Sequence, residues 1–331
     1  MLVKFLRKDS PAVLLVLLVA TVGIWFRNLF GIAAPIHIPE LTYGTPVELF
    51  INRINIDFPH LSIWGGFAIM VLVMVQMQSL NNQYIFIPKR SVLPQILFVV
   101  VGFSFLSVQN LTPALVALPI IGLAFSSIFA SYRKDYAQGD TFLAAFFMSL
   151  AAVIYLPAIT FVLTLFFALI IMRPFSWREW IAMLAGFIVP LAFLGAYILF
   201  FDSELLNELS SFDSAKFIPA IPTSITSFFG YSFIAINLLA FASSALFLIG
   251  WTATQKVRTN KIYLIFFFLI ANTFLSYLVI PVVSKDIIVI AALPASYIIS
   301  VYLLFVRRTF IADAIVTLIL MLSILLQLFP E

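Results

Sequence analysis

The sequence has no cysteine and only two histidines among its 331 residues. The absence of cysteine excludes disulfides, thiolate nucleophiles and cysteine-ligated metals. With His37 and His60 alone, a metal centre that needs three or four imidazole ligands is also excluded. Charge is scarce as well, because Asp, Glu, Lys and Arg together make up only 10% of the residues. No nucleic-acid partner is expected.

Apolar residues are what the chain has in abundance. They make up 63% of the sequence, and the mean hydropathy is +1.15. A hydrocarbon core about 30 Å thick is spanned by helices of about 20 apolar residues, and every backbone amide in it must be paired. The sequence therefore predicts an all-α, polytopic transmembrane helical bundle of about 11 spans. The predicted spans are 12–32, 61–79, 94–109, 112–131, 141–156, 158–173, 180–201, 226–252, 262–281, 287–305 and 309–328.

Two parts of the predicted topology have an alternative interpretation, the first span and the short pair around Pro157. The first span is not a cleavable signal peptide, because its long apolar run ends in Trp25-Phe26-Arg27 without a small-x-small cleavage site. The pair 141–156 and 158–173, separated by Pro157, is short enough to form either two spans or a re-entrant pair. The whole chain, 1–331, is expected to form a single transmembrane domain.

The basic residues orient the bundle. A cytoplasmic N-terminus places 14 of the 18 Lys and Arg residues on the cytoplasmic side, as the positive-inside rule predicts. Only Arg27, Arg53, Lys216 and Lys285 then fall outside. With an odd number of spans the C-terminus is also outside. The cytoplasmic set is Lys4, Arg7, Lys8, Lys89, Arg90, Arg133, Lys134, Arg173, Arg178, Lys256, Arg258, Lys261, Arg307 and Arg308.

Two longer loops lie on the outer side, at 33–60 and 202–225, and each predicts an interfacial helix. In the first, Thr45, Pro46 and Glu48 form a capping box with proline at the first helical position, and Pro59 ends the helix. Its apolar side is Val47, Phe50, Ile51, Ile54 and Phe58, whereas Glu48, Asn52, Arg53, Asn55 and Asp57 occupy the rest. The second loop repeats this pattern more weakly after Asp202 or Ser203. Such helices lie flat and can cover a cavity open to lipid.

Few ionisable residues are candidates for catalysis or ligand binding. Glu40 has no evident local structural task, which makes it the first choice for a catalytic acid or base. His37 and Glu40 have the spacing of a ligand pair, but Pro35 and Pro39 disfavour the helix that would bring them together. No metal site is therefore predicted. Arg53 and Asp57 are four residues apart and form, most simply, an exposed ion pair.

Polar residues inside the spans are few. Asp313 lies near Arg307 and Arg308 and is expected to form an ion pair at a helix end. The amides Gln76, Gln78, Gln95, Asn237 and Asn272 are expected to join helices rather than line a transport path.

The cytoplasmic side carries a second capping box and several basic pairs. Ser176 and Glu179 would start the seventh span, with Trp177 and Trp180 as interfacial anchors. The basic pairs would hold anionic lipid headgroups, with specific binding of a lipid phosphate as the less favoured alternative.

Two segments carry a resemblance to known proteins. They are Lys89-Arg-Ser-Val-Leu-Pro94 and the stretch from Gly139-Asp140 through Pro157 to Arg173-Pro-Phe-Ser-Trp-Arg-Glu-Trp180. They resemble an uncharacterised family of bacterial inner-membrane proteins. The layout of residues 1–200 is also similar to the membrane half of the GT-C glycosyltransferases. That resemblance implies a polyprenyl-phosphate lipid as partner and glycosyl transfer at the outer face.

The resemblance also implies site residues. Glu40, with Asp57 in reserve, would act as the catalytic carboxylate, Arg53 and Lys216 would bind the lipid phosphate, and a divalent cation would bridge phosphate and carboxylate. GT-C enzymes carry a catalytic aspartate early in the first outer loop, where this chain has Glu40. Two alternatives stay open. One is a non-catalytic subunit that holds other envelope membrane proteins together, and the other is a small-molecule or lipid transporter.

Overall fold

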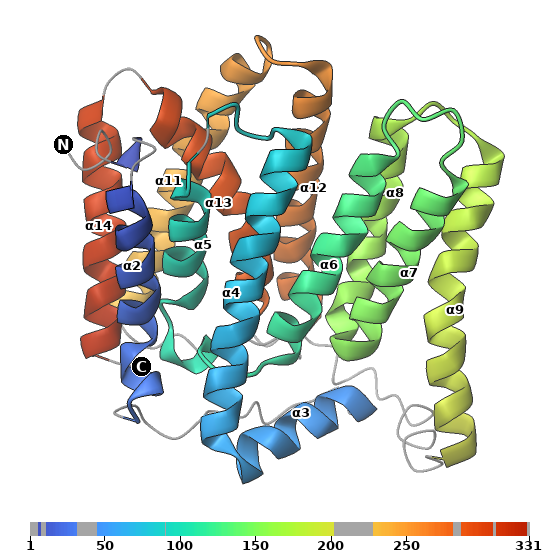
Figure 1. Cartoon of the computed structure of the whole chain (residues 1–331), viewed down its shortest axis with the longest axis horizontal. Coiled ribbons are helices and arrows are strands. Elements are labelled where there is room, and N and C mark those ends of the chain that lie inside the picture. Colours follow the sequence, from blue (N-terminus) through green and yellow to red (C-terminus); the bar gives the residue numbers. More distant parts are fainter. Residues whose placement is uncertain are drawn as a thin grey trace.

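The computed structural model describes residues 6–7, 11–31, 45–89, 91–201, 228–280, 286–306 and 309–329. Within these ranges the chain is a bundle of helices without a strand (Figure 1). The helices are α2 Pro11–Leu29, α3 Pro46–Asp57, α4 Pro59–Tyr84, α5 Leu93–Phe103, α6 Pro113–Ala130, α7 Gln138–Ile154, α8 Phe161–Met172, α9 Trp177–Phe201, α11 Phe228–Thr252, α12 Val257–Val279, α13 Ile287–Phe305 and α14 Thr309–Leu328, with 3₁₀ turns η1 Leu106–Val108 and η2 Leu156–Thr160.

Eight of the described helices are long and apolar enough to cross a membrane. They are α2, α4, α6, α9, α11, α12, α13 and α14. Three further apolar helices are shorter, at Leu93–Phe103, Gln138–Ile154 and Leu156–Met172. The all-helical bundle is thus confirmed and the chain is a multi-pass membrane protein, whereas eleven full spans and their orientation stay predictions.

The core of the bundle lies around α5 and α13. Every residue of α5 is buried, and most of α13 is buried against it. The two helices approach so closely that a Cβ added at Gly102 would lie 3.2 Å from the Cβ of Ala292. At about 1.5 Å per residue, α5 is far shorter than the hydrocarbon layer. An end inside the apolar layer is tolerated because other parts of the protein surround it.

Helices α7 and α9 pack against each other through small residues. Buried residues of α7 include Ala144, Ala145 and Ser149, and the Ser149 hydroxyl donates to the Phe187 carbonyl of α9 at 2.7 Å. A Cβ at Gly186 would lie only 2.3 Å from the Phe142 carbonyl oxygen. Small residues allow two backbones to approach in this way in membrane bundles.

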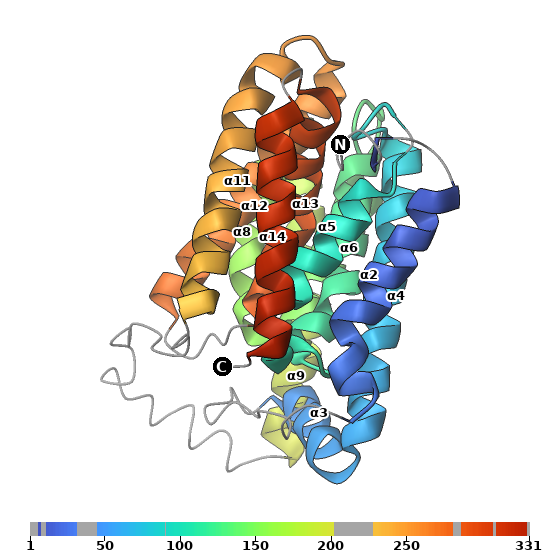
Figure 2. The ribbon, with the colours of Figure 1, turned by 90° about the vertical axis from the view of Figure 1, so that its left-hand side faces the viewer.

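Helix α3 lies across one end of the bundle, the end opposite the start of α2 (Figures 1 and 2). Thr45 caps it by accepting a hydrogen bond from the Glu48 amide at 3.3 Å, and α4 starts at Pro59, so the predicted helix is confirmed with its boundaries. The second predicted interfacial helix, in 202–225, lies outside the described residues.

The faces of α3 differ from the prediction. Its buried residues are Glu48, Ile51 and Asn55, whereas the predicted apolar residue Phe50 is 64% exposed. The physical reason lies in the segment before α6: the Asn55 amide donates to the Leu111 carbonyl at 3.1 Å, and its oxygen accepts from the Ser62 hydroxyl. The side of α3 that faces the bundle is therefore mixed, with Glu48, Asn55 and the apolar Ile51, whereas Phe50 and the Arg53–Asp57 pair are exposed.

The α7–α9 contact generates a test. We expect Gly186→Ala to lower the free energy of unfolding by roughly 1–3 kcal/mol, because the new methyl group overlaps the Phe142 carbonyl. The control is Gly195→Ala on the same helix, where the added Cβ meets nothing within 4 Å. There the free energy should stay the same or rise by about 0.5–1 kcal/mol, since alanine favours helix over glycine. Thermal unfolding of the purified protein in detergent measures both; equal shifts would contradict the contact.

Candidate functional site

The predicted outer-face site is described only in part. Glu40, His37 and Lys216 lie outside the described residues. Arg53 and Asp57 lie on the last two turns of α3, with Arg53 Nε 3.6 Å from Asp57 Oδ2 and side chains 82% and 49% exposed. They form the exposed pair that their spacing predicted. Among the described residues, no three His, Asp or Glu side chains gather to hold a metal ion.

At the same end of the bundle, neutral amides satisfy helix-end carbonyls. Asn28 near the end of α2 donates to the carbonyls of Leu106 and Gln109, both at 3.3 Å. Gln109 donates in return to Ile24 at 3.0 Å and to Phe103, the last residue of α5, at 2.7 Å. These bonds tie α2 to the irregular segment between α5 and α6.

Helix α14 joins this network. Gln327 donates to the Ser104 carbonyl at 2.9 Å, and the Ser104 and Ser323 hydroxyls are 2.7 Å apart. Arg27 of α2 donates to the Gln327 carbonyl at the end of α14. The sequence prediction passed over Asn28 and Gln327, although amides near the ends of apolar runs were a signal for such bonds.

The predicted inter-helix amides largely behave as expected. Gln95 of α5 donates to Gln78 of α4 at 2.6 Å, and Gln76 donates to the Pro119 carbonyl of α6 at 2.9 Å. Asn272 of α12 donates to the Thr160 carbonyl at 2.7 Å. Asn237 is the exception, since it donates within its own helix to Phe233 at 2.8 Å.

The opposite end of the bundle uses cations for the same task. Arg173 follows α8, and its guanidinium donates to the carbonyls of Ser131 at 2.7 Å and Lys134 at 2.6 Å, just beyond α6. It also pairs with Glu179 of α9 at 2.8 Å, in a contact where both side chains are more than nine-tenths buried. One side chain thereby connects the ends of α6, α8 and α9.

This pair replaces the predicted capping box. The Glu179 carboxylate pairs with Arg173 and does not reach back to the Ser176 amide. The reason is electrostatic, because a buried guanidinium needs a countercharge more than a backbone amide at a helix start needs an acceptor. Trp180 also differs from a simple anchor: it stacks on Phe166 with ring centroids 5.5 Å apart, whereas Trp177 is exposed.

Three more cations bond to helix ends here. Arg258, in the first turn of α12, donates to the Phe129 carbonyl of α6 at 3.0 Å. Lys261 donates to the Met172 carbonyl at the end of α8 at 3.4 Å. Arg7 donates to Leu303 and Val306 at the end of α13, both at 2.8 Å. Such bonds supply partners for the carbonyls that a helix end leaves open.

The surroundings of Arg7 also bear on Asp313. Partial burial lowers the pKa of the Arg7 guanidinium, and the negative charge of Asp313 acts in the opposite direction. Asp313 thus lies in the electrostatic reach of Arg7. The predicted partners Arg307 and Arg308 lie outside the described residues.

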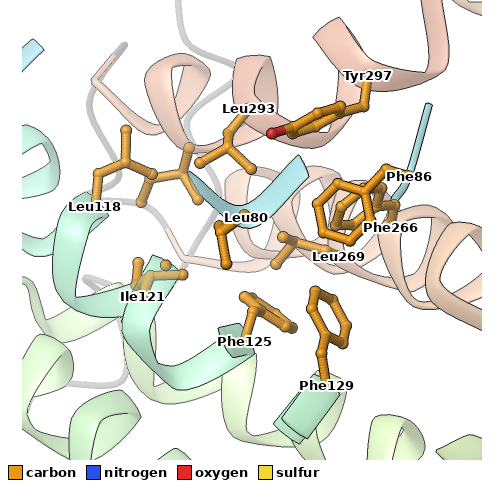
Figure 3. Close-up of a pocket in the computed structure, with 12 residues that line it drawn as sticks. Leu80, Phe86, Leu118, Ile121, Phe125, Phe129, Phe266, Leu269, Leu293 and Tyr297 are labelled. Carbon is orange, nitrogen blue, oxygen red and sulfur yellow. The ribbon is translucent and has the colours of Figure 1, made fainter. Parts of the chain in front are cut away.

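An apolar pocket lies deeper in the bundle, between α4, α6, α12 and α13 (Figure 3). Phe125, Phe129, Phe266 and Leu293 are among the side chains around it. The free space of about 10 Å³ corresponds to about one water molecule, and a cavity lined by such groups stays dry. It offers no group for catalysis.

The chain matches no protein-family model, no curated protein and no solved structure. The class that the fold defines is an integral, multi-pass helical membrane protein.

The buried pair Arg173–Glu179 and the exposed pair Arg53–Asp57 should differ in how much they contribute to the free energy of unfolding. Arg173→Ala should lower the free energy of unfolding by about 3–5 kcal/mol, since it leaves the Glu179 charge buried without its partner. The matched control Arg53→Ala removes the exposed pair of α3 and should cost only a few tenths of a kcal/mol. Chemical denaturation in mixed micelles compares the two. Similar losses would show that burial does not distinguish these pairs.

Proposed function

We propose that the protein handles a polyprenyl-phosphate-linked glycan at the end of the bundle where α3 lies, in a bacterial inner membrane. The observation that carries the proposal is α3 itself, which lies across this end and contacts α4, α6 and α7. Its outward side exposes Leu49, Phe50 and Ile56. A flat apolar surface beside the ends of spans suits a long isoprenoid chain, because each buried CH₂ group contributes about 0.8 kcal/mol.

The residues predicted for the two outer loops, together with Arg53 and Asp57 of α3, supply the roles that transfer needs. A carboxylate, Glu40 or else Asp57, takes the proton of the acceptor hydroxyl as its oxygen bonds to the anomeric carbon. The bond from that carbon to the phosphate oxygen breaks at the same time, and the phosphate leaves with the bonding electrons. Arg53 and Lys216 hold the phosphate and stabilise its growing charge. Among the described residues no carboxylate cluster fits a divalent cation, so no step is assigned to one.

The exposure of the Arg53–Asp57 pair supports a role in binding. An ion pair this exposed contributes little to stability, so either side chain can turn toward a ligand at small cost. Arg53 also lies about one turn from the outward apolar residues of α3, Phe50 and Ile56. A phosphate held at Arg53 would therefore have its isoprenoid chain beside an apolar surface.

Native mass spectrometry of the gently extracted protein tests the lipid. We expect a polyprenyl-phosphate species at near one to one, and at least about tenfold lower affinity for it in Arg53→Ala, since a hydrogen bond to a charged group contributes about 1.5–3 kcal/mol. The matched control is Lys134→Ala, which removes an ion pair at the other end of the bundle and should leave occupancy unchanged. Ordinary phospholipid alone in the wild-type protein would end the proposal.

Transfer activity tests the carboxylates separately. Glu40→Ala should abolish transfer of labelled sugar while lipid occupancy is kept, because a general base acts on the acceptor and not on the lipid. Asp57→Ala reports whether the reserve residue contributes. If both variants transfer the sugar at the wild-type rate, neither carboxylate is the general base, and only the lipid-binding part of the proposal stands.

A second candidate function is a non-catalytic subunit of a larger envelope complex. The observation that favours it is the outer surface of α9 and α11, where Phe193, Phe228 and Leu246 are each about three-quarters exposed. Partner helices can cover such a surface as well as lipid does. A partner protein in fixed stoichiometry after mild extraction, without a polyprenyl lipid, would select this function.

A further inference from the structure

At the end of the bundle opposite α3, three cations surround one aromatic ring. Lys261 Nζ lies 5.3 Å from the ring centroid of Tyr132, Arg133 Cζ lies 5.5 Å from it, and Arg258 Cζ lies 5.7 Å from it. Arg258 also lies over the ring of Tyr84, at 4.7 Å. We call Tyr132, Arg133, Arg258 and Lys261 the basic cluster.

No cation of the basic cluster forms an ion pair within the described part of the chain. The ion pairs found there are Arg53–Asp57, Lys134–Asp140 and Arg173–Glu179, and none includes a cation of the cluster. Like charges gathered around one ring repel one another, and the π faces of the tyrosines compensate only in part. The arrangement is therefore one that an anion would stabilise.

The cluster also keeps unused hydrogen-bond donors. Arg258 donates to the Phe129 carbonyl, yet its Nε is buried without an acceptor. Lys261 makes one long bond, 3.4 Å, to the Met172 carbonyl, out of the three that an ammonium can make. A ligand with several acceptor oxygens, such as a phosphate, fits these donors.

The first turn of α12 adds to the same field. It has no acidic residue, and the N-cap residue Lys256 makes no side-chain cap bond. Cations at a helix N-terminus oppose the helix dipole, whereas an anion there is stabilised by it and by the open amides. Arg258, in the first turn, thus occupies a position that is unfavourable unless an anion is present, and Lys261 follows about one turn later.

The surface of α8 and α12 next to the cluster is apolar. An apolar surface beside the cations favours a lipid over a free anion as the ligand. Leu264 follows Lys261 by one turn of α12 and is exposed, and Phe268 stacks on Phe167 of α8 at 4.7 Å. Ile170 of α8 is exposed on the neighbouring helix. Headgroup-binding cations followed by an apolar surface along two adjacent spans match the shape of a phospholipid.

From this geometry we propose that the basic cluster binds the phosphate of an anionic phospholipid, with its acyl chains along α8 and α12. This site is independent of the glycan function, since it lies at the other end of the bundle. Arg258 and Lys261 contact the phosphate, Tyr132 positions them through cation–π contacts, and Arg133 adds charge at the rim.

Native mass spectrometry with added lipid tests the site in the full chain. Phosphatidylglycerol and phosphatidylcholine with the same acyl chains are titrated against the detergent-solubilised protein, and we expect the former to bind more tightly. The double variant Arg258→Gln, Lys261→Gln should lose about 25-fold in affinity for phosphatidylglycerol, since each cation near a membrane surface contributes about fivefold. The single variant Lys261→Gln gives up the long bond and the cation–π contact with Tyr132 and should lose about fivefold. It tests the site even if the double variant does not fold.

The control removes two other cations at the same end. Lys134→Gln, Arg178→Gln lowers the charge equally but should change the affinity less than twofold. An equal loss in this control would mean general surface charge and overturn the site. Equal binding of the two lipids by the wild-type protein would also overturn it. Competition by millimolar inorganic phosphate would show a free-phosphate site instead of a lipid site.

Discussion

The structure depends on one constraint, the need to pair the open carbonyls of helix ends in a bundle built almost wholly of apolar residues. Each helix leaves its last carbonyls without intrahelical partners, and an unpaired carbonyl in an apolar environment costs several kcal/mol. The chain meets this need with side chains from neighbouring helices. Asn28, Gln109 and Gln327 serve at one end, and Arg7, Arg173 and Arg258 at the other. The same bonds hold the helices together.

The two ends differ in chemistry because their donors differ. The amides of Asn28, Gln109 and Gln327 are neutral and buried among α2, α5 and α14, and the partly buried Arg27 donates beside them to the Gln327 carbonyl. Cations serve at the end where the chain collects its basic residues, and there Arg173 takes Glu179 as buried countercharge. The short central helix α5 is possible for the same reason, since Gln109 and Gln327 bond to the carbonyls of Phe103 and Ser104 at its end.

The features predicted correctly from the sequence are those that depend on composition or on residues close together in the chain. The all-helical bundle, the Thr45 cap and the Pro59 boundary follow from composition and from residues close together in the chain. The orientation of α3 did not follow, because Asn55 faces the Leu111 carbonyl, 56 residues further on. The Ser176–Glu179 box was wrong for a similar reason: the partner of Glu179 is a guanidinium that is fixed by carbonyls beyond α6. Of the proposed glycan site, only Arg53 and Asp57 are described.

The bonds of Arg7 have a consequence for biosynthesis. Its acceptors, Leu303 and Val306, lie almost 300 residues later in the chain. When the spans are inserted in the order of the sequence, the Arg7 guanidinium lacks these acceptors until α13 has been inserted. Docking of the N-terminal segment is then a closing event of assembly, and a nascent chain truncated before α13 would leave its first helix unanchored at that end.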